Sequence, residues 1–481
     1  MITGIVVGAG PNGLAGAVTL ARAGLRVTVL EAADTIGGGT RTSELTVPGV
    51  LHDHCSAAHP FGPGSPFLRT LGLERHGLRW AYPDVDLAHP MDIGPAGVMV
   101  RSLDDTVAGL GPDGAAWRRL FGPLAEHFDA LCEDLLQPVV HLPRHPVRLA
   151  LFGLQALQPA ARSARRFATD RARALFAGTA AHAFRPFARP TSAAVGLMLM
   201  AACHSYGWPV ARGGSRSITD ALAADLRAHG GTIETGVRVR ALHELPPADA
   251  VLLDLAPSAV ADIAGDRLPA RVARAYRRYR HGPGAFKLDL AVQGGVPWTD
   301  EHCTRAANVH LGGTFEEVAH AELEVHRGRI PERPFVLVGQ QYLADPCRSA
   351  GDIHPIWAYA HVPHGYPGDA TEAIVAQIER FAPGVRERIV ATAARSPRDM
   401  EAYNANYVGG DIITGANTML QVALRPRVAL DPYSTGIPGV YLCSAASPPG
   451  AGAHGMCGAN AAASALRHLG IQAAHRGTRR G

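Results

Sequence analysis

A glycine-rich segment near the N-terminus has the spacing of a phosphate-binding turn. The stretch 8–13 (GAGPNG) follows the β-branched run 5–7 and precedes apolar residues at helical spacing. Gly8 permits a tight turn, Gly10 lets the backbone approach a pyrophosphate, and Gly13 allows close packing of helix on strand. Strand, turn and helix in this order predict a dinucleotide site.

Two features beyond the glycines support this prediction. Pro11 and Asn12 begin the predicted helix, whose amino-terminal end attracts phosphate charge. A second strand, expected over 26–30, ends at Glu31, whose carboxylate can bind both hydroxyls of an adenosine ribose. No basic residue stands there to favour a 2′-phosphate. The alternative is a glycine-rich turn of some other α/β protein.

A second glycine cluster follows the acid at 37–41 (GGGTR). A plain NAD-dependent dehydrogenase has no reason to be glycine-rich at this point, whereas some flavoproteins pass such a loop along the diphosphate and flavin. The cluster therefore favours FAD as cofactor, and a surface turn is the alternative. The residues expected to contact the cofactor here are Gly38, Gly39, Thr40 and Arg41.

The C-terminal part of the sequence repeats the arrangement of strand, turn and helix. The segment 439–444 predicts a strand, 448–458 (PPGAGAHGMCG) a glycine-rich turn, and 460–469 an alanine-rich helix. A second helix N-terminus facing an anion is the expected result.

With these motifs, the chain resembles the bacterial phytoene-desaturase-like flavoproteins of the flavin amine oxidase superfamily. It is most similar to their pyridine-nucleotide-disulphide-oxidoreductase-domain branch. The resemblance covers nearly the whole length. Besides the N-terminal segments it rests on 207–222 (GWPVARGGSRSITDAL), 379–388 (ERFAPGVRER), 404–412 (NANYVGGDI), Arg425-Pro426 and 439–462 (GVYLCSAASPPGAGAHGMCGANAA).

The resemblance implies contacts for residues that spacing alone does not assign. Gly452, His454, Gly455 and Met456 would lie along the isoalloxazine, and the backbone from Cys457 to Asn460 would cap its N1/C2 end. Val239 matches the position that pairs with adenine through its backbone. Ser444 stands where the family commonly has glycine, and it too is expected near the cofactor.

The resemblance also implies the fold class. It predicts an α/β, Rossmann-like FAD-binding domain of the glutathione-reductase type with an inserted α+β substrate domain. The FAD-binding parts are expected at 1–79, 206–279 and 425–481, and the substrate parts at 80–205 and 280–424. A chain of 481 residues is long enough for both domains.

Three side chains are candidates for catalysis. Lys287 is the only lysine of the chain, on a strand expected around 285–291, and resembles the lysine that flavin amine oxidases aim through water at the flavin. A solvent-exposed lysine is the alternative. His54, in a histidine-rich loop after the GGG segment, and His454 could move a proton near neutral pH. A surface histidine cluster is an equally good interpretation of the loop.

Composition limits the remaining classes. The net charge of +4 and aromatic content of 6% come with no nucleic-acid motif, so no nucleic-acid partner is expected. Seven scattered cysteines without metal-ligand spacing predict no metal site and a reducing, cytoplasmic location. The Arg-rich, partly apolar stretch 144–189 could lie on an anionic membrane surface, or could be a helical region with a solvated Arg face.

The leading functional hypothesis is an FAD-dependent dehydrogenase or desaturase acting on a hydrophobic, polyene- or lipid-like molecule by hydride transfer to flavin N5. A quinone or O2 would accept the electrons. The alternatives are an FAD-dependent double-bond isomerase, a flavin amine oxidase, and a flavoprotein without enzymatic activity.

Overall fold

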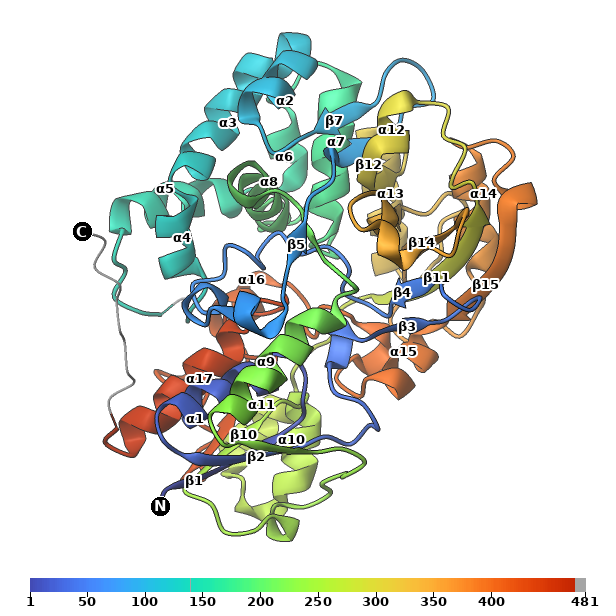
Figure 1. Cartoon of the computed structure of the whole chain (residues 1–481). Coiled ribbons are helices and arrows are strands. Elements are labelled where there is room, and N and C mark those ends of the chain that lie inside the picture. The colour runs from blue at the N-terminus through green and yellow to red at the C-terminus, as the bar shows by residue number, and fades with distance from the viewer. Residues whose placement is uncertain (139, 472–481) are drawn as a thin grey trace.

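The computed structural model describes residues 1–138 and 140–471, and its first layer is a parallel five-stranded sheet. Its strands, in spatial order, are β16 (Val440–Leu442), β10 (Ala250–Leu253), β1 (Thr3–Val7), β2 (Arg26–Leu30) and β9 (Thr232–Glu234). Neighbours in this sheet come from three distant stretches of the chain. The N-terminal and C-terminal parts therefore build one domain together, in the lower half of Figure 1.

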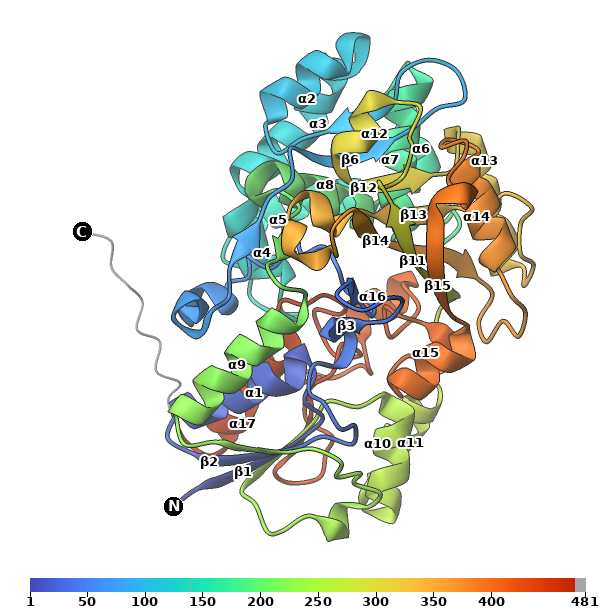
Figure 2. The same cartoon turned by 45° about the vertical axis from the view of Figure 1, so that its right-hand side comes forward.

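Helices cover both faces of this sheet. The side chains of β1 point alternately to the two faces and are apolar on both, so each face has to be covered. Val6 packs toward one face and Ile5 and Val7 toward the other. On the first face lie α1 (Pro11–Arg22), α9 (Arg216–Ala228) and α17 (Met456–His468), and near the second lie α10 (Pro257–Ala264) and α11 (Ala270–Arg277). Figure 2 shows α1, α9 and α17 side by side above the strands.

The second layer is a seven-stranded, mostly antiparallel sheet. Its order is β15 (Ile389–Arg395), β11 (Gly284–Gln293), β14 (Ile353–Val362), β13 (Val336–Gly339), β12 (Ala306–Leu311), β6 (Val85–His89) and β7 (Gly97–Met99), and only β12 and β6 run parallel. Two short ribbons, β3 (Thr42–Glu44) with β4 (Leu51–Asp53) and β5 (Trp80–Ala81) with β8 (Val210–Ala211), complete the strands. Five helices lie between β11 and β16 in the chain: α12 (Glu301–Arg305), α13 (Phe315–His326), α14 (Thr371–Glu379), α15 (Pro397–Tyr403) and α16 (Met419–Leu424).

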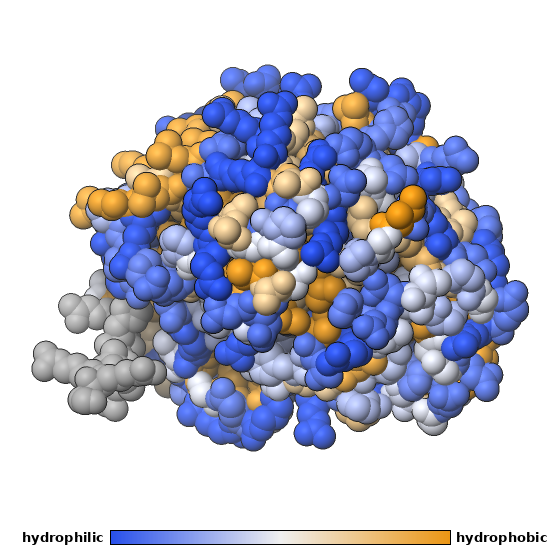
Figure 3. Space-filling view, turned by 90° about the horizontal axis from the view of Figure 1, so that it is seen from above, coloured by the Kyte–Doolittle hydropathy of each residue, from blue (hydrophilic) through white to orange (hydrophobic). Residues whose placement is uncertain are grey.

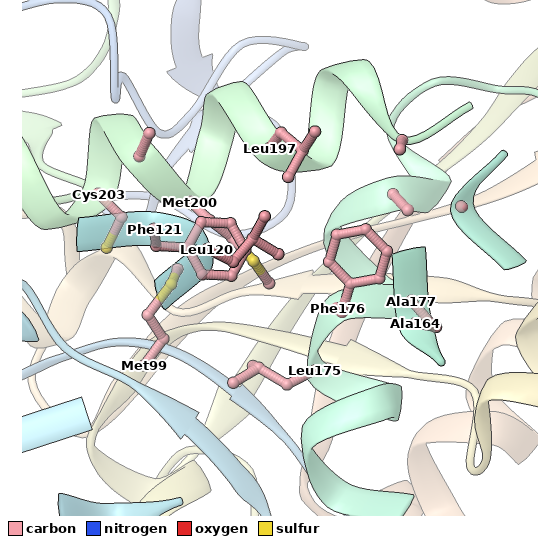
Figure 4. Packing of buried hydrophobic residues seen from close by; sticks show 14 of the residues in the cluster. Met99, Leu120, Phe121, Ala164, Leu175, Phe176, Ala177, Leu197, Met200 and Cys203 are labelled. Carbon is pink, nitrogen blue, oxygen red and sulfur yellow. The ribbon is translucent and has the colours of Figure 1, made fainter. Parts of the chain in front are cut away.

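A helical region stands beside the second sheet. It consists of α2 (Leu103–Gly109), α3 (Gly114–Glu126), α4 (Phe128–Leu135), α5 (Pro146–Ala156), α6 (Ala160–Ala164), α7 (Asp170–Ala181) and α8 (Ala194–Tyr206). Its core is packed from facing helices, with Phe121 of α3, Phe176 of α7 and Met200 of α8 fully buried (Figure 4). The apolar run that begins near 193 thus forms a buried helix, and none of the described helices is long and apolar enough to cross a membrane.

The predicted fold class is confirmed, with two local corrections. The C-terminal helix begins at Met456 rather than at 460, because Gly455 has a φ of 70° and ends the preceding turn there. The stretch 144–189 contains the three helices α5, α6 and α7, and its contact with a membrane surface stays a prediction. Lys287 is buried at 2% exposure, so its solvent-exposed alternative is wrong. The domain boundaries stay a prediction, and the end of the segment 425–481 lies outside the described residues.

Candidate functional site

One cavity of about 1050 Å³ connects the two sheets. At one end its wall contains the glycine turn, Glu31 and the segment 237–239. At the other end it contains the aromatic side chains Trp357 and Tyr359 of β14. The cavity thus extends from the predicted dinucleotide site into the region expected to choose a substrate.

The glycine turn is tightly packed, and its glycines have no side chains that would fill the space in front of the backbone. A Cβ at Gly13 would lie 2.1 Å from the carbonyl oxygen of Gly8, and Gly8 itself has a φ of 101°. Gly10 is the N-cap residue of α1, with Pro11 at its first position. Gly8, Gly10, Pro11 and Asn12 line the cavity, whereas Gly13 is buried behind them as the packing role requires.

Glu31 lies at the carboxyl end of β2, close beside the turn. Its carboxylate accepts hydrogen bonds from the backbone N–H groups of Ala9 (2.7 Å) and Ala33 (2.9 Å). Arg41 approaches Oε1, the oxygen that accepts from Ala33, at 3.4 Å. The carboxylate is held in place and still lines the cavity, which is the arrangement needed to bind ribose hydroxyls. The glycine turn, helix N-terminus and acid therefore fit a dinucleotide.

The GGG loop lies directly beside the glycine turn, where the backbone N–H of Gly37 donates to the carbonyl of Ala9 at 2.9 Å. Gly38, Gly39, Thr40 and Arg41 all line the cavity, and Gly38 to Thr40 form a short 3₁₀ turn. The Tyr403 hydroxyl donates to the carbonyl of Gly38 at 2.5 Å, and a Cβ on Gly39 would lie 2.0 Å from the Tyr407 hydroxyl oxygen. Two tyrosines from the second half of the chain thus fix this loop.

The C-terminal turn meets the cavity only in part. Residues 448–454 line it, including Gly452 and His454. Gly455, Met456, Cys457 and Asn460 do not, because they begin α17 and pack inward. Met456 contacts the helical core and the Asn460 side chain donates to the carbonyl of Leu136 at 3.2 Å.

The two other residues implied by the family resemblance have different positions. Val239 lines the cavity near Glu31, in an irregular segment after β9. Ser444 follows β16 and is buried beside the cavity wall, where its hydroxyl donates to the carbonyl of Leu255 at 2.7 Å.

His454 is the one catalytic candidate that lines the cavity. Its Nδ1 accepts a hydrogen bond from the backbone N–H of Met456 at 3.1 Å, and burial lowers the pKa of His454 to about 4. The ring is therefore neutral near pH 7, with its proton on Nε2. In this state the Nε2–H of His454 is a hydrogen-bond donor, and the backbone carbonyl of Ala451 is one acceptor beside it.

Lys287 lies on β11, as predicted, next to the cavity wall without lining it. Its ammonium forms a buried ion pair with Asp289 and stands 5.0 Å from the ring centroid of Trp357, which does line the cavity. Burial lowers the pKa of Lys287, and the negative charge of Asp289 opposes that shift. The ring of Trp357 thus lies between Lys287 and the cavity.

His54 also lies behind the wall, one residue before the lining residue Cys55. Its Nε2 is 2.6 Å from the Ser43 hydroxyl, and its ring is 5.0 Å from that of Tyr403. Burial, with Arg395 and Lys287 nearby, lowers the pKa of His54 to about 3. The loop is therefore a buried cluster and not a surface one.

Asp254 is a site residue that the sequence interpretation missed. It follows β10 directly and accepts a hydrogen bond from the backbone N–H of Gly13 at 2.9 Å. Burial raises the pKa of Asp254 to about 7, and the charge of Glu31 adds to the shift. The sequence carries a signal for Asp254, because ligand-facing residues commonly follow the carboxyl end of a parallel strand next to the phosphate turn.

The outer cavity wall is mostly apolar. It includes Phe152 of α5, Phe184, Trp208, Leu337, Trp357 and Tyr359. The only acidic residues in the wall, as far as the chain is described, are Glu31 and Asp254 at the dinucleotide end. No sequence motif marks these apolar residues, since they come from separate elements and meet only in the fold.

A sequence profile agrees with the geometry of the turn. The profile of the NAD(P)-binding Rossmann-like domain matches residues 6–71. This range contains β1, the glycine turn, Glu31 and the GGG loop. The chain therefore carries a Rossmann-type dinucleotide-binding unit at its N-terminus.

The comparisons extend the similarity to the full length. A mouse protein named pyridine nucleotide-disulfide oxidoreductase domain-containing protein 2 is 23% identical over 97% of this chain and 93% of its own length. An oxidoreductase from Methanosarcina mazei has a TM-score of 0.65 at 15% identity, over 97% of this chain and all of that chain. Cyclohexylamine oxidase from Brevibacterium oxydans has a TM-score of 0.56 at 17% identity, over 98% and 99% of the two chains. The predicted resemblance is confirmed, and the structural likenesses establish a shared fold.

Proposed function

We propose that this chain is an FAD-dependent oxidoreductase that dehydrogenates or desaturates a hydrophobic small molecule. The observation that carries the proposal is the single cavity that joins a dinucleotide cradle to an apolar, aromatic wall. A cofactor held at one end and a substrate held at the other would share this space, as hydride transfer requires. The fold shared with oxidoreductases supports the same activity.

The residues of the cradle have separate tasks in this proposal. Glu31 binds the ribose, the N-terminus of α1 faces the pyrophosphate, and the GGG loop borders the flavin. When bound, FAD supplies the hydride acceptor, with a quinone or O2 as the final electron acceptor. The apolar wall excludes water from the reacting carbon atoms.

The charge distribution favours a neutral substrate over an amine. Both acids of the described wall, Glu31 and Asp254, lie at the cradle, so the outer part provides no carboxylate for an ammonium group. A cation without such a partner loses its hydration with no compensation. An uncharged polyene or lipid-like molecule does not lose the hydration of a charge on binding. We therefore rank amine oxidation below desaturation.

We also propose how the three polar candidates contribute. His454 would orient the substrate or flavin through Nε2–H, since it is on the wall. Lys287 and His54 would act from behind the wall, Lys287 through its contact with Trp357 and His54 by holding the loop beside Cys55. Of the three, His454 is therefore the first residue to vary in kinetic work.

The surface around the cavity suggests how a hydrophobic substrate could enter. On α5, Val147, Leu151 and Leu154 are 60–70% exposed, while Phe152 of the same helix lines the cavity. On α16, Leu420 is 70% exposed and Val422 lines the cavity. Hydrophobic side chains gather on the side of the molecule where α5 lies (Figure 3).

We call the exposed residues Val147, Leu151, Leu154 and Leu420 the entry patch. We propose that the entry patch rests on a lipid surface, from which the substrate passes between α5 and α16. Arg144 and Arg148 at the start of α5 would attract anionic headgroups. Contiguous exposed apolar patches commonly mark such interaction sites.

An absorbance spectrum of the purified protein tests the central proposal. Bound oxidised FAD should give bands near roughly 370 and 450 nm, and an anaerobic hydrophobic substrate should bleach them. Turnover of a polyene without bleaching or acceptor consumption would instead favour the double-bond isomerase. Protein that cannot be reconstituted with FAD would contradict the proposal, and FAD that no substrate or reductant reduces would indicate a flavoprotein without enzymatic activity.

A further inference from the structure

Two buried histidines face each other at the outer end of the cavity. His182 ends α7 and lines the cavity, and His310 lies on β12 behind it. Their Nε2 atoms are 3.2 Å apart and their ring centroids 5.1 Å apart. Burial lowers the pKa of His182 to about 3 and that of His310 well below its ordinary value, so both rings are neutral. One of the two Nε2 atoms must therefore carry the hydrogen that joins them.

The surroundings of His310 decide which nitrogen carries it. His310 is completely buried, and its Nδ1 faces the backbone of α7, where a Cβ on Gly178 would lie only 2.4 Å away. This Nδ1 has no hydrogen-bond partner in the described part of the chain. A hydrogen on Nδ1 would be an orphaned buried N–H, which proteins avoid more strictly than an underused acceptor. The hydrogen of His310 therefore belongs on Nε2, from which it is donated to His182.

This assignment fixes the tautomer of His182. Because its Nε2 accepts from His310, its own hydrogen must be on Nδ1. Within residues 1–138 and 140–471 the His182 side chain forms one hydrogen bond, the one that joins its Nε2 to His310, so Nδ1–H is left for a ligand. The ring belongs to a mostly apolar wall, beside Trp208 at a centroid distance of 6.1 Å.

We propose that His182 donates a hydrogen bond through Nδ1–H to a neutral oxygen of the substrate, and that His310 is the positioning residue that fixes this tautomer. The substrate would then be a largely hydrocarbon molecule with a carbonyl or hydroxyl group. A neutral imidazole gives no charge to compensate a carboxylate, so a carboxylate is a poorer match for the group that contacts His182. The inference rests on the proposed function, because it takes the cavity as a hydrophobic substrate site.

The tautomers can be measured without any substrate. Two-bond ¹H–¹⁵N correlation spectra of the FAD-loaded, ¹⁵N-histidine-labelled protein distinguish Nδ1–H from Nε2–H, with His182→Gln and His310→Gln supplying the assignments. We expect Nδ1–H for His182 and Nε2–H for His310. In a His310→Leu variant, which has no donor at this position, His182 should shift toward the Nε2–H form that free imidazole side chains favour. An Nε2–H signal for His182 in the parent protein would overturn the assignment.

The substrate contact is tested with isosteric probes. Methyl undecyl ketone and the alkene in which a methylene replaces its oxygen differ only at the predicted contact, and the corresponding alcohol separates carbonyl from hydroxyl recognition. Quenching of tryptophan fluorescence reports binding, since Trp208 and Trp357 line the cavity. We expect the ketone or the alcohol to bind about five to ten times more tightly than the alkene.

The matched variants separate the possible outcomes. His182→Phe should remove the preference for oxygen and leave alkene binding intact, whereas His320→Phe, which changes an exposed histidine of α13, should alter neither. A preference that survives in His182→Phe would overturn this inference while the hydrophobic site stands. If none of the probes binds to the parent protein, the proposed hydrophobic substrate fails, and the substrate contact of His182 fails with it.

Discussion

Asp254 is a carboxyl group in an unusual place, beside the N-terminus of a helix that is built to face phosphate. Its pKa is raised to about 7, from an ordinary value of 3.8, by burial and by the nearby charge of Glu31. The folded protein therefore holds a proton here that the unfolded chain releases near pH 4. Stability from this group is present below about pH 4 and is lost as the pH rises to about 7.

We predict that Asp254→Asn removes this pH dependence. The amide has the same shape, keeps an acceptor for the N–H of Gly13 and cannot ionise. Near pH 8 the variant without bound cofactor should exceed the parent in free energy of unfolding by roughly 2–4 kcal/mol, and near pH 4 the two should be similar. Urea unfolding at both pH values measures the difference. Parallel stability profiles of parent and variant would refute the prediction.

Glu31 is predicted to act on cofactor affinity instead. Glu31→Gln keeps the shape of the side chain but loses the charge that holds a ribose and the backbone N–H groups of Ala9 and Ala33. FAD affinity should fall by about ten- to a hundredfold, as for the loss of a charged hydrogen bond. Flavin fluorescence titration gives the dissociation constant. Glu44→Gln, at an exposed position of β3, should leave the affinity unchanged.

At the scale of elements, boundaries that depend on local residues are predicted more closely than boundaries that depend on tertiary contacts. The second strand was predicted at 26–30 and forms β2 over those residues, because β-branched residues between two loops define a strand locally. The start of α17 was missed because Gly455, Met456 and Cys457 look like a turn in sequence. Met456 and Cys457 become helical where Gly458 packs on the backbone of Asn12, a contact between opposite ends of the chain.

The candidate site shows the same division. The glycine turn, Glu31 and the GGG loop could be found from sequence because one short segment carries all three. The outer wall could not, since Phe184, Trp208 and Trp357 are separated by long stretches and no spacing links them. A residue such as His54 was chosen for its chemistry, and only the fold places it behind the wall.

The entry patch gives a prediction for α5 and α16. Leu151→Asp combined with Leu420→Asp should weaken binding to vesicles of phosphatidylcholine and phosphatidylglycerol by at least about tenfold, because two apolar contacts with the bilayer are lost. Both leucines are more than half exposed, so the fold should be unaffected. Vesicle co-sedimentation measures the change.

The control for this prediction is Ile93→Asp. Ile93 is 92% exposed but lies in the loop between β6 and β7, outside the entry patch. Its substitution introduces one of the same charges, where the double variant introduces two, and should leave vesicle binding as it is. Equal losses in the control and the double variant would show that charge alone is responsible, and no binding by the parent protein would rule out the lipid surface.

A buried ion-pair network around Arg348 links the two halves of the molecule. Arg348, in a short turn between β13 and β14, is completely buried and forms ion pairs with Asp53 of β4 and Asp345. Asp53 also accepts a hydrogen bond from the backbone N–H of Ser215 at 2.8 Å, just before α9. One guanidinium therefore joins the second-sheet half of the chain to the segment that returns to the dinucleotide half.

We predict that Arg348→Met lowers the free energy of unfolding by about 3–5 kcal/mol, because it leaves two buried carboxylates without their counter-charge. Arg386→Met should change it by less than about 1 kcal/mol, since Arg386 forms only exposed ion pairs with Glu372 and Glu379. Urea unfolding of both variants provides the comparison. Equal stability of the two would mean that the buried network contributes no more than a surface pair.

A combined variant distinguishes the cost of unpaired charge from the loss of packing. Arg348→Met together with Asp53→Asn and Asp345→Asn removes every charge of the network while keeping the side-chain shapes. If unpaired carboxylates cause the destabilisation, the triple variant should be more stable than Arg348→Met alone, because buried neutral groups cost less than buried ions. If the triple variant is the less stable of the two, the network acts through its hydrogen bonds, and the junction between the halves depends on geometry more than on charge.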